Sequence, residues 1–176
     1  LSQNSMYKAN GDGTYTVVTD NTTIVVRSVS EFKTAMANEA IATIVLGDNL
    51  TANEILVINR DVTLNGNGYT LTSTMSGTSG RAINVSGAND ATIKNLTVKA
   101  AGQRAINVIQ NTKKVTIDNV TATAANYTVN VAGSAAGAQV FIQNSDLTGL
   151  NAVNIGAANV NVSINNTTIT CNDNSD

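Results

Sequence analysis

The chain of 176 residues has no histidine, no proline and no tryptophan. Without histidine, no site in this protein can depend on an imidazole side chain. The single cysteine, Cys171, excludes an internal disulfide, and its position is more typical of a residue near a strand end than of a reactive thiol.

The sequence also has few charged residues and no long apolar run. A net charge of −2 gives no reason to expect nucleic acid or an acidic lipid surface as a partner. No apolar run approaches the length of a membrane span, so we expect no membrane insertion. The sequence shows no signal-peptide pattern, and we expect any export signal to have been removed or to lie outside these residues.

Repetition is the strongest pattern that the sequence does contain. The segment RAINV occurs at 81–85 and again at 104–108, and it is followed by YTVNV at 127–131 and NAVNI at 151–155. A second series reads TIKN, TIDN, FIQN and SINN, at 92–95, 116–119, 141–144 and 163–166. A period of 22 to 25 residues with alternating apolar and polar positions predicts stacked coils of three short strands each. The expected fold is all-β: a single-stranded parallel β-helix of about six coils, right-handed as parallel crossovers generally are.

The alternation also predicts which side chains face the core. In the first strands these are Ile83, Val85, Ile106, Val108, Val129, Val131, Val153 and Ile155; in the second Leu64, Ile93, Ile117, Ile142 and Ile164; in the third Leu71, Val98, Ala122, Leu147 and Ile169. Between the second and third strands an asparagine recurs, a residue that tolerates the left-handed backbone of a tight corner. These corner residues are Asn95, Asn119, Asn144 and Asn166, and the earliest complete coil has NGNG at 65–68 instead.

The N-terminal part should cover the first coil. Ser28 and Glu31 form a capping-box pattern, and Val29, Phe32, Met36 and Ala40 fall on one helical face. We therefore expect an N-terminal hairpin segment at 1–27 with its turn at Asp12-Gly13, a capping helix at 28–40, and the β-helix at 41–176.

The helix, the segment 43–72 and the repeated AINV…ATIKNLTV coils together resemble the right-handed parallel β-helix proteins of the pectin-lyase-like group, most closely their non-catalytic, adhesin-type members. The resemblance covers roughly residues 28–170 and implies the fold more strongly than the function. The group's hydrolases have paired aspartates and a Gly-His-Gly segment, and both are missing here. Its lyases use an Arg or Lys base beside calcium held by clustered carboxylates, whereas Asp61, Asp90, Asp118 and Asp146 fall in different columns or turns. We therefore expect neither catalysis nor a metal or other cofactor.

The candidate binding residues lie on the first strands. Residues 81–114 hold six basic side chains against Asp90 alone, and residues 115–176 hold four aspartates and no basic residue. Arg81 and Arg104 would stack in neighbouring coils, where like charges repel unless an anion or a carboxylate relieves them. The predicted ligand-binding set is Arg81, Asn84, Arg104, Asn107, Asn130 and Asn154. An alternative for the asparagines is an amide ladder that only stabilises the stack.

The function that we expect is a secreted or cell-surface module for adhesion, contacting a polysaccharide or another surface glycan. Three alternatives stay open: a lyase-like enzyme with an unrecognised site, a structural spacer in a larger surface protein, and an ice-binding protein. The last rests on threonine pairs along the third strands, such as Thr121 and Thr123, although Lys99 and Asp146 interrupt them. The C-terminal end has no evident cap, so we expect chain continuation or an end-to-end contact there.

Overall fold

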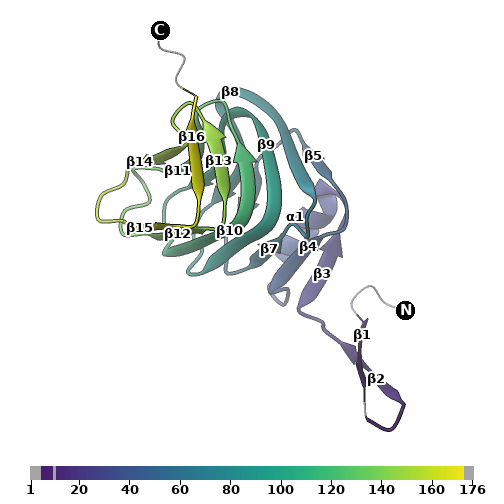
Figure 1. Cartoon of the computed structure of the whole chain (residues 1–176). Coiled ribbons are helices and arrows are strands. Elements are labelled where there is room, and N and C mark those ends of the chain that lie inside the picture. The colour runs from purple at the N-terminus through teal and green to yellow at the C-terminus, as the bar shows by residue number, and fades with distance from the viewer. Residues whose placement is uncertain (1–4, 10, 173–176) are drawn as a thin grey trace.

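A computed structural model describes residues 5–9 and 11–172 of the chain. These residues form a parallel β-solenoid of about six turns, as the repeats predict, with one short helix near the N-terminal end (Figure 1). The antiparallel hairpin of β1 (Ser5–Ala9) and β2 (Tyr15–Thr19) projects away from the solenoid at the same end. Its turn holds Asp12, which accepts hydrogen bonds from the backbone and hydroxyl of Thr14.

One face of the solenoid carries the second strand of every coil. Its strands pair in parallel in the order β3 (Thr23–Val26), β4 (Thr43–Leu46), β7 (Thr63–Asn65), β9 (Ala91–Val108), β10 (Lys114–Thr123), β12 (Gln139–Gln143) and β15 (Asn161–Asn165). The parallel sheet thus already includes β3, which precedes the helix.

The other two faces are built from first and third strands: β5 (Leu50–Ala52), β6 (Leu56–Ile58), β8 (Thr70–Val85), β11 (Tyr127–Val131), β13 (Asp146–Gly149), β14 (Val153–Ile155) and β16 (Thr168–Cys171). Strands β8 and β9 run without a break from the third strand of one coil into the first strand of the next. Their mutual register shifts between Ser73 and Gly77 and again between Gly77 and Arg81.

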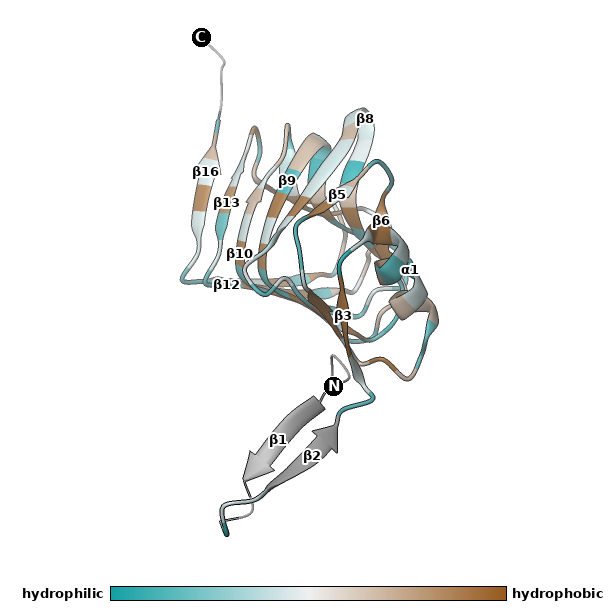
Figure 2. Ribbon diagram, turned by 90° about the vertical axis from the view of Figure 1, so that its right-hand side faces the viewer, coloured by the Kyte–Doolittle hydropathy of each residue, from teal (hydrophilic) through white to brown (hydrophobic). Residues whose placement is uncertain are grey.

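The core is a set of apolar columns that run along the solenoid axis. Ile93, Ile117 and Ile142 are register partners on successive second strands and are at most 1% exposed. Figure 2 shows the same alternation of apolar and polar residues along β9, β10, β13 and β16, which lie side by side. The predicted inward positions are confirmed as far as Leu147.

The last coil differs from that prediction. Ile155, Ile164 and Ile169 are 48%, 42% and 40% exposed, and Val153 is half-buried. They continue the inward columns of the earlier coils, since Ile164 pairs with Ile142 and Ile169 with Leu147. Their exposure follows because no further coil covers this edge within the part of the chain that the structure describes.

The corners between second and third strands have the predicted geometry. Asn95, Asn119, Asn144 and Asn166 have φ angles of 51°, 53°, 52° and 45°. A β-branched or other bulky residue would be strained there, whereas asparagine adopts this conformation readily.

Helix α1 (Val29–Ala37) lies against the N-terminal end of the solenoid and buries Phe32, Ala35 and Met36. Ser28 is its N-cap, as predicted, with Oγ accepting from the backbone N–H of Glu31 at 3.1 Å. The helix ends three residues earlier than the expected span, so Ala40 lies outside it and is exposed. Among the described residues, no helix has the length and apolar character needed to cross a membrane.

The C-terminal end of α1 is bound by Arg60, which sequence reasoning did not single out. Its guanidinium donates to the carbonyl oxygens of Ala35, Met36 and Asn38, each at 3.0 Å, and to that of Ile41 at 2.6 Å. A cation at a helix C-terminus satisfies carbonyls that have no partner inside the helix. Arg60 therefore holds α1 on the solenoid.

Candidate functional site

The first strands of three successive coils place Arg81, Arg104 and Tyr127 in one column, which we call the arginine column. Arg81 on β8 is the register partner of Arg104 on β9, and Arg104 is that of Tyr127 on β11. The predicted stacking of the two arginines is thus confirmed. All three side chains are partly exposed, and the guanidinium carbon of Arg104 lies 5.5 Å from the centre of the Tyr127 ring, within cation–π range.

Among the described residues, no carboxylate forms an ion pair with Arg81 or Arg104; the ion pairs Lys33–Glu54 and Lys114–Asp90, each at 2.9 Å, involve other basic residues. Burial, and secondly the positive charge of Arg104, lower the pKa of the Arg81 guanidinium. Arg81 donates to the carbonyl of Ser79, while the Nε atom of Arg104 is buried and has no hydrogen-bond partner in the described structure. Two partly desolvated like charges in neighbouring strands would be stabilised by an anion.

The asparagines of the first strands form an amide ladder. Asn107 donates to Asn84 at 2.9 Å, Asn130 to Asn107 at 2.7 Å, and Asn154 to Asn130 at 2.7 Å. Asn107 and Asn130, both in the predicted ligand-binding set, are buried, with 4% and 3% of their surface exposed. Each of these two amides lies between amides of the coils on both sides, whereas Asn84 and Asn154 at the ladder's ends are half-buried. These hydrogen bonds between coils favour the alternative, a ladder that stabilises the stack, for Asn107 and Asn130.

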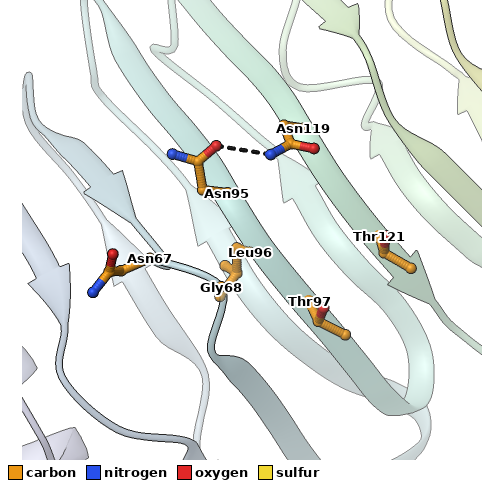
Figure 3. Close-up of a pocket in the computed structure, with 7 residues that line it drawn as sticks. All are labelled: Asn67, Gly68, Asn95, Leu96, Thr97, Asn119 and Thr121. Atoms are coloured by element: carbon orange, nitrogen blue, oxygen red, sulfur yellow. Dashed lines mark hydrogen bonds between the residues drawn. The ribbon is translucent and has the colours of Figure 1, made fainter.

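A shallow groove of about 350 Å³ follows the corner between the second and third strands (Figure 3). Its walls carry amide and hydroxyl groups and no charged side chain. The corner groove, as we name it, is lined by Asn67, Gly68, Asn95, Leu96, Thr97, Asn119 and Thr121. Sequence reasoning treated its asparagines as turn residues only. The extra length of NGNG at 65–68 was the signal that this corner differs from the others.

Threonines form two kinds of columns. On the third strands, Thr121 pairs with Thr97 but also with Asp146, and Thr123 pairs with Lys99, so the interruptions predicted from the sequence lie within the array. On the second strands, sequence reasoning missed an unbroken column: Thr23, Thr43, Thr63, Thr92 and Thr116. It ends at Phe141, and the residues two positions along from these threonines vary from Val25 to Asp118. Neither face therefore repeats the same threonine pair in every coil, which is the pattern on which the ice-binding alternative rests.

Charged side chains of neighbouring coils meet at two places on the surface. Lys114 forms an ion pair with Asp90 at 2.9 Å. Lys94 and Asp118 are register partners, but Asp118 accepts a hydrogen bond from Asn144. Within residues 11–14 and 20–172, no three Asp, Glu or Cys side chains come together as ligands for a metal ion.

Comparison with known proteins bears on the same region. A family model described as a pectate lyase-like adhesive domain matches residues 23–130, which include the arginine column and the corner groove. No curated protein and no solved structure was found to match the chain. The family match confirms the resemblance to adhesin-type members of the pectin-lyase-like group. Because it covers more than half of the sequence, the chain belongs to the family of pectate lyase-like adhesive domains.

Proposed function

We propose that this adhesion-type module acts at a cell surface or in secreted form, and that it binds acidic glycans through the arginine column. The observation that carries the proposal is the pair Arg81 and Arg104, stacked in neighbouring strands with no carboxylate partner in the described structure. Membership of an adhesive-domain family supports the same class of function.

The chemistry of the column suits a uronate. A guanidinium can hold a carboxylate through two parallel hydrogen bonds, and strand spacing puts the backbones of the two arginines roughly 4.8 Å apart. Asn84 lies on the same strand as Arg81 and accepts from Asn107 through its oxygen, so its amide nitrogen remains for a sugar hydroxyl. Asn107 and Asn130 support this arrangement from within the ladder.

Catalysis is the main competing function. Hydrolysis of a glycosidic bond usually needs two carboxyl groups flanking that bond, and in the described part of the chain no carboxylate pairs with the arginine column. A lyase site at the arginine column would need an arginine as its base, and burial together with the positive charge of Arg104 lowers the pKa of the Arg81 guanidinium. For this reason the test of function must include an assay for lyase activity.

A glycan array run beside a lyase assay separates the three functions. The array should carry polygalacturonate, alginate and neutral polysaccharides, and the lyase assay should contain calcium. We expect binding to the acidic polymers without the ultraviolet absorbance of an unsaturated product. Product absorbance would show that the protein is an enzyme and would overturn the proposal. An array without any binding would favour a structural spacer.

We also propose that the last coil pairs with a second copy of the chain. Its inward residues Ile155, Ile164 and Ile169 are exposed, and residues 147–172 include no charged residue that would discourage pairing at a strand edge. Light scattering after size exclusion should give a dimer for the parent and a monomer for Ile164→Lys. A monomeric parent at high concentration would contradict this contact.

A further inference from the structure

The corner groove arises because one corner is longer than its neighbours. Residues 65–68 fold down onto the next coil, where the backbone N–H groups of Gly66 and Gly68 donate to the carbonyls of Lys94 and Asn95 at 2.8 and 2.9 Å. A Cβ atom on Gly66 would lie 2.5 Å from that oxygen of Asn95, so only glycine allows this close approach. Asn67 and Gly68 form one wall of the groove, and backbone hydrogen bonds hold this wall in place.

The opposite wall presents polar atoms that the fold does not use. Asn119 donates to Asn95 at 2.9 Å, but Asn144 donates to Asp118 instead of continuing this ladder. The Oδ1 atom of Asn119 is consequently left as an acceptor facing solvent. The hydroxyl groups of Thr97 and Thr121 have no hydrogen-bond partner among the described residues, and Figure 3 shows both on the neighbouring strands beyond the corner.

We propose that the corner groove binds an uncharged sugar unit. Amide and hydroxyl groups both donate and accept, as sugar hydroxyls require, and no charged side chain lines the groove to favour an ion. Buried Leu96 forms an apolar floor between the two walls. Its volume of about 350 Å³ is at the low end of the range for small-molecule sites, which fits one or two sugar rings.

The groove is separate from the arginine column. The groove lies where second strands turn into third strands, whereas the column lies on the first strands. The inference does not depend on the binding of acidic glycans. Two sites on one module would let a mixed polysaccharide make two weak contacts at once, which raises its apparent affinity.

The test is a titration of ¹⁵N-labelled protein with cellobiose and with maltose, followed by the amide signals of residues 66–68, 95–97 and 119–121. We expect saturable shifts confined to these residues with at least one of the two sugars. The double variant Thr97→Val, Thr121→Val removes both hydroxyl groups and keeps the shape. It should weaken binding roughly fivefold or more, the loss expected from one to two hydrogen bonds.

The matched control is Thr72→Val with Thr123→Val, which makes the same change on the same face outside the groove. It should bind the sugar as the parent does. Arg81→Gln with Arg104→Gln should also keep these shifts while losing the acidic glycan, so the two sites can fail separately. No saturable shift with either sugar, or equal weakening by both valine pairs, would overturn the proposal.

Discussion

The side-chain nitrogen of Asn119 donates a 2.9 Å hydrogen bond to the side-chain oxygen of Asn95, and both residues hold the left-handed backbone of a tight corner. One asparagine thus serves two purposes: it tolerates a φ of 53° and it ties one coil to the next. Glycine could adopt this backbone conformation but could not form the hydrogen bond, and a β-branched residue could do neither.

Asn119→Val should therefore destabilise the domain by about 1–3 kcal/mol, the usual cost of a strained backbone plus a lost hydrogen bond. Asn119→Gly is the matched control, since it keeps the corner and loses only the amide, and its cost should be clearly smaller. Urea unfolding followed by circular dichroism measures both. Equal free energies of unfolding for the parent and the valine variant would contradict the corner's role.

A second prediction about stability concerns Arg60. Arg60→Lys keeps the charge but cannot reach four carbonyl oxygens from one planar group. We expect a loss of about 1–3 kcal/mol and early unfolding of α1, since several of the hydrogen bonds between the helix end and the solenoid are lost. Hydrogen exchange at residues 32–37 reports the helix directly. Unchanged protection there would show that α1 is held by its apolar face alone.

Deletion tests the cover of the N-terminal end. A chain without residues 1–40 lacks α1 and β3, which exposes the edge of β4 and apolar residues such as Ile44 and Ile58. We expect this variant to aggregate, because free edges and apolar patches associate. Deleting only residues 1–19 removes the hairpin and should leave a soluble, cooperatively folding domain. A monodisperse product from the longer deletion would count against α1 as a cap.

Acid should destabilise the fold partly through Asp61. Its carboxylate accepts from the backbone N–H groups of Asp90 at 3.0 Å and Asn89 at 2.6 Å. The bond from Asp90, followed by that from Asn89, holds the pKa of Asp61 below its ordinary value of 3.8 despite opposing desolvation. The unfolded chain therefore binds the proton first as the pH falls, so unfolding becomes easier in acid. This stabilisation is present above the ordinary value and is lost as the pH falls through the lowered pKa of the folded state.

Asp61→Asn keeps an acceptor oxygen and removes the titration. The difference in unfolding free energy between pH 7 and pH 3 should be smaller for this variant than for the parent. The same pH dependence in both proteins would show that Asp61 contributes nothing to the acid sensitivity.

Local patterns predicted the fold well because each depends on neighbouring residues. The inward positions of Ile83 and Ile106 follow from alternation along a strand, and the corner at Asn119 follows from the conformational freedom of asparagine. The burial of Asn107 could not be predicted in the same way, since it depends on amides from the coils above and below. The groove could not be predicted either, because it depends on how far the residues at 65–68 extend relative to the next coil.

The role of Arg60 was missed for a related reason. Its partners lie 19 to 25 residues earlier in the chain, and no repeat connects them. A basic residue just before Asp61 looks like any solvated charge until the helix is placed beside it. The arginine column, by contrast, could be predicted because RAINV occurs twice in register.

The most direct test of acidic-glycan binding is retention on a polygalacturonate column at low salt, where screening is weakest. Arg81→Gln with Arg104→Gln keeps most of each side chain's stem and removes both charges. Lys94→Gln with Lys99→Gln is the matched control, since it removes two charges from the same basic coils outside the column. We expect the arginine variant to lose most of its retention while its unfolding temperature stays level or rises, and the lysine variant to be retained nearly as the parent is. Equal retention of the arginine variant and the parent would contradict the proposed site.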